Sequence, residues 1–237
     1  PRCKKTDFSS LKFAGGGGAP LSEDNLREWQ SVAGVPALEG YGMTEGAPTC
    51  TNGISLNRKP LSVGPPVLGI ELEIVDIETG TRKMKPGEPG EIRVRGSHIV
   101  KSYFNNDEAT KNAFREGWLY TGDIAYKDED DYVFIVDRSK DMVIVSGFNV
   151  FPREIEEVLV SHPKIKEAAA IGVPHRQKGE VVKAFISPVQ QGSLSKDDVI
   201  SFCKNQLVGY KIPAELEFRA ELPKTPVGKI DKKQLKA

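Results

Sequence analysis

Hydrophobic and polar positions alternate strongly in the middle of this chain of 237 residues. The alternation is clearest in Ile70–Val75 and Glu91–Arg95, and a turn-rich stretch, Pro86–Gly90, lies between them. A period of two predicts half-buried strands, and the intervening turn residues favour antiparallel pairing. We therefore expect a small antiparallel β-barrel, or alternatively a sandwich, over about residues 62–136.

Short apolar runs and one helical pattern make up the first part of the chain. Phe8–Phe13 and Val35–Leu38 are typical of short strands, and Gly15–Pro20 is typical of a loop. Between them, Ser22 can cap a helix whose apolar residues share one face. A strand–loop–helix–strand series of this kind indicates the end of a larger α/β domain.

Beyond residue 140 the pattern predicts a mixture of helices and strands. Pro152 fits the first turn of a helix that Pro163 ends. Ser195 and Asp198 have the spacing of a capping box at the start of a second helix. Three further apolar runs predict strands, at 168–173, 181–186 and 216–218.

Together these patterns predict an α+β fold in two domains. Residues 1–137 are expected to form the C-terminal part of a large α/β domain that includes the β-barrel. Residues 141–237 are expected to form a small α+β domain. The charged residues around Lys140 favour an exposed, flexible connector at the junction.

Composition narrows the class of protein. Lys plus Arg equals Asp plus Glu at 33 each, which argues against a nucleic-acid-binding protein. Cys3, Cys50 and Cys203 are too far apart for a zinc knuckle or a disulfide framework, so we expect reduced thiols in the cytoplasm. No apolar run approaches the roughly 18–20 residues of a membrane span. Because the chain starts at Pro1 and soon reaches a glycine-rich segment, we expect its N-terminus to be a cut within a domain.

Two glycine-containing motifs could accommodate a nucleotide. Gly15–Gly18 would let the backbone approach a flat or anionic ligand, although a plain turn is the better explanation of this segment taken alone. No Gly-Lys-Ser/Thr follows, which excludes the phosphate loop of P-loop NTPases. In Tyr41–Glu45, the ring can stack on a base, Thr44 can bind a phosphate, and Glu45 can hold Mg²⁺. The alternative is an ordinary strand end with a solvated Glu45.

Three charged residues outside these motifs are also candidates. Asp123, which follows Gly122, could accept hydrogen bonds from a ribose diol. Arg138 could contact ribose or phosphate through its rigid guanidinium. Lys229, on a loop rich in Gly and Pro, could neutralise a phosphate and a carboxylate together. Taken singly, each has an ordinary explanation: a turn cap, a charged hairpin and a solvated lysine.

The order and spacing of these motifs resemble the adenylate-forming superfamily of acyl-CoA synthetases, luciferases and peptide-synthetase adenylation domains. The strongest stretches are Gly40–Glu45, Gly117–Asp123, Asp137–Glu156 and Pro223–Lys229. Within Asp137–Glu156, Val145–Pro152 is most similar to bacterial long-chain fatty-acid:CoA ligases. The resemblance implies an ATP-dependent, AMP-forming ligase. Such an enzyme converts a carboxylate and ATP to acyl-AMP, and the thiol of CoA then displaces AMP.

The resemblance also implies a role for each matching residue. Thr44 would contact phosphate, Glu45 would hold Mg²⁺, and Lys229 would stabilise the charge that develops during adenylation. The remaining implied residues are Gly17, Gly18, Ala19, Tyr41 and Gly42 on the adenine side, Asp123 and Arg138 at the ribose, Lys140 as the hinge between a large AMP-binding domain and a small lid domain, and Gly147 beside the pantetheine channel.

The chain also departs from the pattern of this family. The phosphate-binding loop and most of the acyl pocket, which lie upstream in the family, have no counterpart here, so we expect the chain alone to be inactive. The implied partners are a fatty acid, ATP/AMP, Mg²⁺ and CoA, and the implied location is the cytoplasm, with peripheral contact at the inner face of the membrane left open. An aryl-CoA or acyl-carrier-protein ligase is the alternative enzyme. A non-catalytic binding module is less favoured, because it would not need Glu45, Asp123, Arg138 and Lys229 together.

Overall fold

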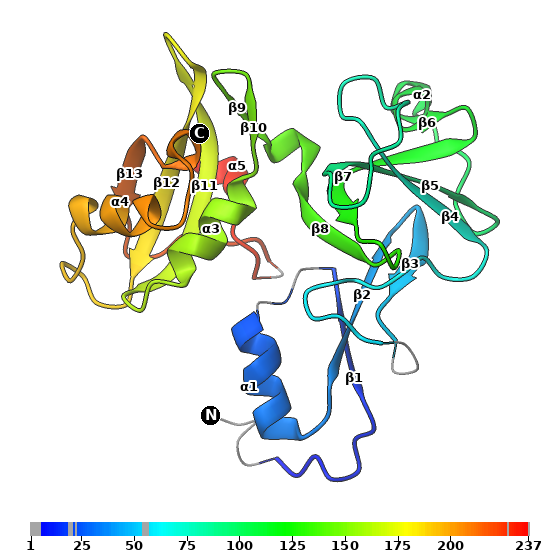
Figure 1. Cartoon of the computed structure of the whole chain (residues 1–237), viewed down its shortest axis with the longest axis horizontal. Helices are drawn as coiled ribbons and strands as arrows, with labels where there is room; N and C mark the ends of the chain where they lie inside the picture. Colours follow the sequence, from blue (N-terminus) through cyan, green and yellow to red (C-terminus); the bar gives the residue numbers. More distant parts are fainter. Residues whose placement is uncertain (1–5, 19–20, 22, 54–56, 227, 237) are drawn as a thin grey trace. The chain divides into compact units, whose positions relative to one another are not determined.

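A computed structural model describes residues 6–18, 21, 23–53, 57–226 and 228–236. The chain divides into two compact units, Pro1–Val136 and Asp137–Ala237 (Figure 1). Both units combine helices with sheets that are mainly antiparallel. The predicted α+β class is therefore confirmed.

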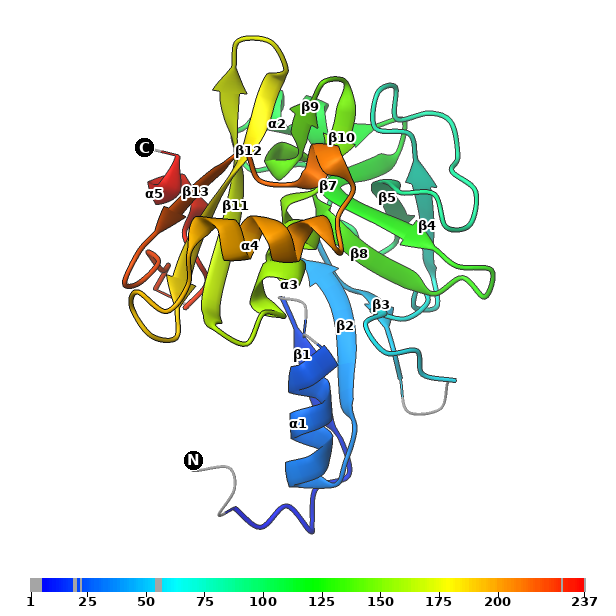
Figure 2. The same ribbon diagram turned by 60° about the vertical axis from the view of Figure 1, so that its left-hand side comes forward.

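The first unit begins with a three-stranded sheet. Strand β1 (Ala14–Gly17) pairs in parallel with β2 (Ala37–Met43), and β2 pairs antiparallel with β3 (Gly46–Thr51). Parallel neighbours need a crossover connection, and helix α1 (Glu23–Ala33) supplies it alongside β2 (Figure 2). The helix confirms the pattern after Ser22, although Ser22 itself lies outside the described residues.

The first strand is displaced from its predicted position. Residues 8–13 form no strand, whereas β1 runs through three of the glycines that were expected to form a loop. Gly17 lies opposite Gly40 in the parallel register, and a Cβ on Gly17 would be 3.2 Å from the Gly40 carbonyl oxygen. The glycines thus permit close strand pairing, and only the next residue, Gly18, has a positive φ of 74°.

A second sheet in the first unit has the strand order β4-β5-β7-β6, and β8 also pairs with β7. The apolar residues of β4 and β5 alternate as predicted, with Leu72, Ile92 and Val94 in the core. The described strands do not close into the predicted β-barrel, because β6 is only two residues long and leaves the sheet open. The bounds are β4 (Ile70–Val75), β5 (Gly90–Gly96), β6 (Phe114–Arg115), β7 (Trp118–Lys127) and β8 (Val133–Arg138), with helix α2 (Asp107–Ala113) before β6.

The second unit is built on one five-stranded sheet with the order β10-β9-β12-β11, in which β13 pairs with β12. The start of α3 at Pro152 is confirmed, and its end at Val160 precedes Pro163 as expected. The capping box is also confirmed, because Asp198 N donates to Ser195 Oγ at 3.1 Å and Ser195 N donates to Asp198 Oδ2 at 3.0 Å. The strands are β9 (Val143–Val145), β10 (Phe148–Val150), β11 (Ile165–His175), β12 (Gly179–Pro188) and β13 (Glu215–Phe218). The helices are α3 (Pro152–Val160), α4 (Lys196–Lys204) and α5 (Lys232–Leu235), with short 3₁₀ turns η2 (Ser139–Asp141) and η3 (Gly209–Lys211).

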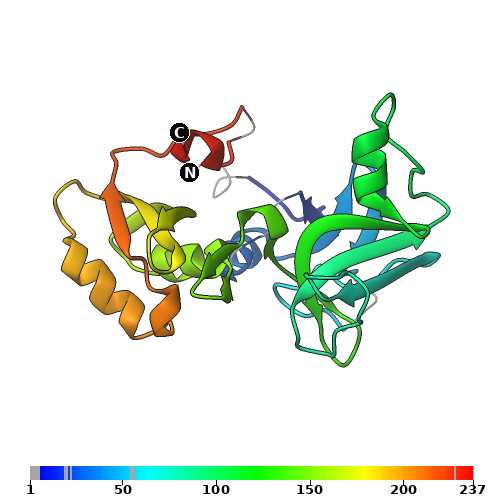
Figure 3. The ribbon, with the colours of Figure 1, turned by 90° about the horizontal axis from the view of Figure 1, so that it is seen from above.

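This sheet is covered on both faces. Ala168 and Ala170 face the core under α3 and α4, whereas Ala169 and Phe185 face Leu235 of α5. Figure 3 shows α4 and α5 on opposite sides of the strands. Because both faces are buried, β11 and β12 are nearly continuous apolar runs. In the described part of the chain, no helix combines the length and the hydrophobicity that a membrane crossing requires.

Candidate functional site

The predicted glycines lie where the parallel strands β1 and β2 end. Gly17 closes β1, and Gly42 is the next-to-last residue of β2. A Cβ on Gly42 would be 2.8 Å from the Cβ of Ala47, so the tight return into β3 requires a residue without a side chain. The carboxyl ends of parallel strands are common ligand-binding edges in α/β proteins. Ala19, which was predicted to join this edge, lies outside the described residues.

Two predicted nucleotide-binding residues are in direct contact. The hydroxyl of Tyr41, on β2, donates a hydrogen bond of 2.6 Å to Oδ2 of Asp123, on β7. Burial and the neighbouring Asp123 charge raise the pKa of Tyr41, so the phenol stays protonated. Asp123 is only 5% exposed. The fold therefore joins residues 82 positions apart into one fixed pair of polar groups.

Glu91 is a part of this region that sequence reasoning missed. Its Oε1 atom accepts a hydrogen bond of 3.0 Å from the backbone N–H of Gly122, which has a φ of +71°. Burial raises the pKa of Glu91, and the Asp123 charge adds to this effect. Glu91 thus fixes the turn that presents Asp123. A single acidic residue on the polar face of a strand carries no signal that would distinguish it from a solvated one.

Glu45 lies in the turn between β2 and β3, and the structure shows it engaged. Its Oε1 atom accepts a hydrogen bond of 2.6 Å from the Tyr103 hydroxyl, and its carbonyl accepts one of 2.8 Å from Val100 N. The hydrogen bond to Glu45 is the main reason that the pKa of Tyr103 rises to about 12. Thr44, beside it, is exposed. Sequence reasoning missed Tyr103, because a tyrosine in a loop far along the chain gives no sign of its partner.

The residues around Glu45 fit a metal that arrives with a nucleotide. Among the described residues, no group of three or more His, Cys, Asp or Glu side chains could hold a metal ion. Mg²⁺ commonly binds to one or two carboxylates and completes its shell with water and substrate phosphates. A single carboxylate at Glu45 matches this mode and does not match a metal site made by protein ligands alone.

The predicted residues Arg138 and Lys140 lie at the start of the second unit. Arg138 ends β8, and its backbone N–H donates to Asp137 Oδ1 at 2.7 Å. The other carboxylate oxygen of Asp137 accepts a hydrogen bond of 2.9 Å from the backbone N–H of Arg153 in the first turn of α3. Lys140 is exposed within η2. The predicted flexible connector is therefore a short 3₁₀ turn, and Asp137 joins it to α3.

Gly147 has a clear structural reason to be glycine. Ser146 and Gly147 form the two-residue turn between β9 and β10, with φ values of +51° and +86°. Positive φ at both positions is the signature of a type I′ hairpin turn. The next residue, Phe148, stacks on Tyr210 with ring centroids 4.5 Å apart. This turn therefore has a defined type and carries an aromatic pair at its base.

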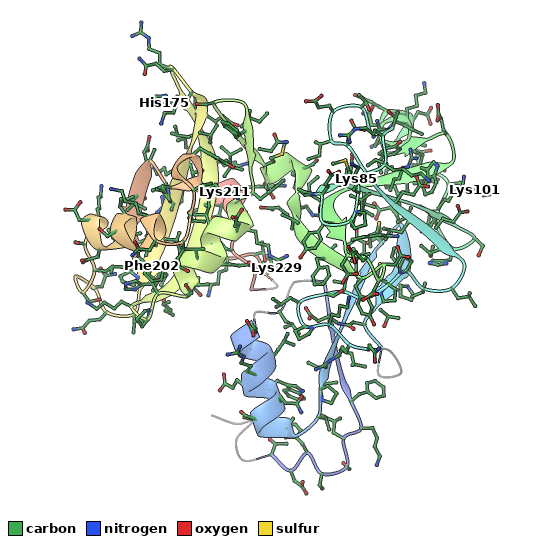
Figure 4. All side chains as sticks on the ribbon, viewed as in Figure 1. Lys85, Lys101, His175, Phe202, Lys211 and Lys229 are labelled. Carbon is green, nitrogen blue, oxygen red and sulfur yellow. The ribbon has the colours of Figure 1, made fainter. Side chains whose placement is uncertain are left out.

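Lys229 is exposed on the loop between β13 and α5 (Figure 4). The loop is closed by its own hydrogen bonds: Thr225 N donates to the Lys229 carbonyl at 2.7 Å, and Gly228 N donates to the Thr225 carbonyl at 2.8 Å. Lys224 and Ile230 form a bridge at its base. The loop therefore has a defined local structure.

The predicted site residues divide between the two units. The first unit holds Gly17, Gly18, Tyr41, Gly42, Thr44, Glu45 and Asp123, and the second holds Arg138, Lys140, Gly147 and Lys229. Within the first unit, the structure joins Tyr41 with Asp123 and places both near the strand edge that leads to Glu45. A single site made from both units stays a prediction.

Comparisons with known proteins agree with these features. The family model "AMP-binding enzyme" matches residues 1–104, and "AMP-binding enzyme C-terminal domain" matches residues 154–229. A long-chain-fatty-acid–CoA ligase of Escherichia coli O157:H7 is 44% identical over 234 residues, which cover 98% of this chain and 41% of that protein. The chain thus spans less than half the length of this relative.

Solved structures give the same result. ATP-bound MatB from Rhodopseudomonas palustris has a TM-score of 0.87 and 38% identity, over 93% of this chain and 44% of that one. The o-succinylbenzoate CoA synthetase of Bacillus subtilis, in complex with its acyl-adenylate intermediate, has a TM-score of 0.85 and 34% identity, over 96% and 46% of the respective chains. The two family models together match more than half of the chain, and the chain belongs to the family of AMP-binding enzymes.

Proposed function

We propose that this chain supplies the C-terminal part of an ATP-dependent, AMP-forming fatty-acid:CoA ligase. Such an enzyme activates a fatty acid with ATP to acyl-AMP and then transfers the acyl group to CoA. The observation that carries the proposal is the partly buried hydrogen bond between Tyr41 and Asp123 at the end of a glycine-lined strand edge. The 44% identity to a bacterial long-chain-fatty-acid–CoA ligase supports the choice of acyl group.

In this proposal the first unit holds the nucleotide. Gly17, Gly18, Ala19 and Gly42 leave room for the adenine, and the Tyr41 ring lies beside it. Because one oxygen of Asp123 already accepts a hydrogen bond from the Tyr41 hydroxyl, the carboxylate is held in one orientation toward the ribose diol. A carboxylate oriented in advance loses less entropy on binding than a mobile one. Thr44 contacts phosphate, and Glu45 holds the Mg²⁺ that accompanies it, which neutralises phosphate charge.

The second unit completes the reaction. We propose that residues 1–137 belong to the large AMP-binding domain and that residues 141–237 are its small lid domain, with Lys140 as the hinge. Arg138 contacts the ribose, and Gly147 lies beside the channel for the pantetheine arm of CoA. Lys229 stabilises the negative charge that develops where the acyl carboxylate meets the α-phosphate. The exposed position of Lys140 in the 3₁₀ turn η2 supports the hinge, since hinges are a few loop residues that absorb backbone rotation.

We also propose a cytoplasmic location with peripheral contact at the inner face of the membrane. ATP and CoA are polar substrates, whereas a long fatty acid partitions into lipid. The balanced charge of the whole chain supports a protein that does not bind nucleic acid. Fractionation of cells that express the protein, followed by a salt wash of the membrane fraction, measures how much of it is bound peripherally.

A hybrid ligase provides the direct test of function. This chain replaces the matching 41% of the E. coli relative, and thioester formation from palmitate, ATP, Mg²⁺ and CoA is measured. We expect activity that Glu45→Gln reduces by about 100-fold or more, because the metal position loses its charge. A matched Glu71→Gln variant, which changes an exposed carboxylate paired with Arg95, should retain it. A folded hybrid that forms no acyl-AMP would favour the non-catalytic binding module.

An aryl-CoA or acyl-carrier-protein ligase is the alternative enzyme. Of these two alternatives, the similarity to an o-succinylbenzoate CoA synthetase favours the aryl-CoA ligase. A second hybrid, built on that B. subtilis synthetase, distinguishes the two acyl classes. If this chain supports o-succinylbenzoate activation better than palmitate activation, relative to each host's own activity, the fatty-acyl assignment is wrong. Replacing CoA by an acyl-carrier protein in both assays tests whether the enzyme is an acyl-carrier-protein ligase.

A further inference from the structure

The C-terminal segment that carries Lys229 packs on one face of the sheet of the second unit. Leu222, Ile230 and Leu235 belong to a small apolar cluster with Phe185 of β12. The main core of the unit, with α3 and α4, lies on the other face. This cluster is smaller than the main core, and polar contacts add to it in holding the Lys229 loop.

A half-buried ion pair holds the segment directly after Lys229. Lys232 Nζ lies 2.7 Å from Glu156 Oε1, and their side chains are only 21% and 19% exposed. The same Glu156 oxygen accepts a hydrogen bond of 2.7 Å from the backbone N–H of Ala170. Glu156 therefore joins three elements, α3, β11 and α5. On the other side of the loop, Lys224 pairs with Glu167, but the Lys224 side chain is 45% exposed.

The same segment is connected to the start of the unit by two routes. Lys236 Nζ, after α5, lies 3.7 Å from Asp141 Oδ1 in η2. The other route runs through α3, which carries Glu156 and whose first turn is bound by Asp137. Asp137 also accepts from the backbone of Arg138. Through these contacts, the loop of Lys229 and the segment from Arg138 to Asp141 are both connected to α3.

We propose that Glu156 and Lys232 are positioning residues that hold the Lys229 loop in a fixed place relative to α3 and the Arg138–Asp141 segment. The proposal rests on the role proposed above for Lys229. The proposal gives a reason for the half-buried Glu156–Lys232 pair. Burying a carboxylate costs free energy of hydration, and only close partners compensate for that loss. A lysine on a loosely tethered loop would lose conformational entropy each time it entered the site, and prior fixation removes that cost.

The chemistry of the pair predicts which substitutions preserve it. Lys232→Arg keeps the positive charge and its donors. Lys232→Met keeps the length of the side chain and removes the charge, which leaves Glu156 with Ala170 N–H as its remaining partner among the contacts described. Removing one member of a buried pair is destabilising, because the other charge stays desolvated. Lys224→Met is the matched control, because exposed pairs contribute little.

Amide hydrogen exchange of the 237-residue chain tests the positioning without any assay of activity. In Lys232→Met we expect amides of residues 228–236 to exchange at least about tenfold faster, while those of α4 and β12 change little. Lys232→Arg should restore the slow exchange, and Lys224→Met should change it by less than about threefold. Unchanged exchange in Lys232→Met, an equal rise throughout the second unit, or failure of Lys232→Arg to restore protection would each overturn the proposal.

The hybrid ligase separates this inference from the proposed role of Lys229. If Lys229 acts in adenylation and its loop is held by Glu156, Lys232→Met should lower kcat for acyl-AMP formation about tenfold or more and leave conversion of supplied acyl-AMP to acyl-CoA intact. Faster exchange in Lys232→Met, together with unchanged acyl-AMP formation in Lys229→Ala, would support the positioning and reject the catalytic role of Lys229. Normal exchange with a strong Lys229→Ala effect would reject the positioning alone.

Discussion

Burial controls the chemistry of the two described cysteines. Cys50 is fully buried beside the core of the first unit, and this burial raises the pKa of its thiol to about 12. Cys203 is buried in the second unit, and burial raises its pKa as well. Because the thiolate is the reactive form, both residues should be inert in the folded chain.

We predict slow alkylation of these two cysteines. With iodoacetamide at pH 8, Cys50 and Cys203 should react at least about 100-fold more slowly in the native chain than in the denatured chain, as measured by peptide mass spectrometry. Reaction of Cys50 at the denatured rate would contradict its position in the core.

The shift of Cys50 also predicts a pH dependence. Its folded pKa lies above the unfolded value, so its contribution to stability is complete below about pH 9 and is lost as the pH rises towards 12. Urea unfolding of the first unit should therefore show falling stability across this range, with a smaller fall in Cys50→Ala. Trp29 and Trp118, the two tryptophans of the sequence, both lie in the first unit and report its unfolding by fluorescence.

Sequence motifs identified individual candidate site residues, but they did not predict which residues those candidates contact. Tyr41 and Asp123 were each expected at a nucleotide, but the hydrogen bond between them joins β2 and β7, two strands of different sheets, and no local pattern encodes that contact. Glu91 and Tyr103 were missed for the same reason. Each looks ordinary in its own segment, and each gains its role from a partner that lies more than thirty positions away, at Gly122 and Glu45 respectively.

At the scale of elements, one glycine is required by the packing of the first unit. Gly64 has a φ of +87°, and a Cβ on it would overlap the carbonyl of Thr51. Gly64 bridges Val133 of β8, and Pro66 bridges Cys50 of β3, so this segment connects the two sheets of the unit. Gly69 has a similar φ of +86° but has no atom within 4 Å of such a Cβ.

These two glycines form a matched pair for an experiment. Gly69→Ala should cost about 1 kcal/mol from backbone strain alone. Gly64→Ala should cost at least about 3 kcal/mol, because the backbone must also move. Urea unfolding followed by tryptophan fluorescence measures both. Equal losses would show that the close approach at Gly64 relaxes without cost.

Elements with strong periodicity were predicted well, and so was the short strand β13, which was expected at 216–218. Two other short elements were not predicted. The alternation in β4 and β5 and the capping box of α4 predicted these elements at the correct positions. Burial on one face of a strand requires alternating apolar residues, and a capping box requires particular residues at a fixed spacing. Strand β10 and helix α5 have three and four residues and are stabilised by tertiary contacts. The glycines of β1 have the sequence pattern of a loop, although their lack of side chains permits close strand pairing.

At the scale of the whole molecule, the division of residues between two units shapes the proposed mechanism. Glu45 and Asp123 lie in the first unit, and Lys229 lies in the second. A residue supplied by a separate unit can act in one step and be withdrawn in another, if the units rotate about Lys140. The sequence predicted the two-part organisation from a change of period, whereas the open sheet that replaces the expected barrel depends on strand lengths and register.

The chain alone should not form acyl-CoA. It spans 41% of the length of the E. coli relative, so more than half of that enzyme has no counterpart in the chain. Catalysis of nucleotidyl transfer depends on positioning and on electrostatic groups that act together. Thioester formation by the purified 237-residue chain, detected by mass spectrometry with ATP, palmitate and CoA, would contradict this prediction.

The role of Lys229 can be separated by half-reaction. During adenylation, negative charge accumulates between the acyl carboxylate and the α-phosphate, and a cation placed there stabilises the transition state more than the bound substrates. In the hybrid ligase, Lys229→Ala should reduce acyl-AMP formation by about 100-fold or more. Conversion of supplied acyl-AMP to acyl-CoA should be nearly unchanged, because in the proposed mechanism the rotated lid carries this lysine away and AMP leaves without its help. Lys233→Ala changes another lysine of the same C-terminal segment; it is the control and should leave both steps intact.

Equal loss in both half-reactions of Lys229→Ala would mean that the residue supports the fold or general nucleotide binding. No loss in either would make Lys229 a solvated surface residue and would remove the chemical reason for a mobile lid.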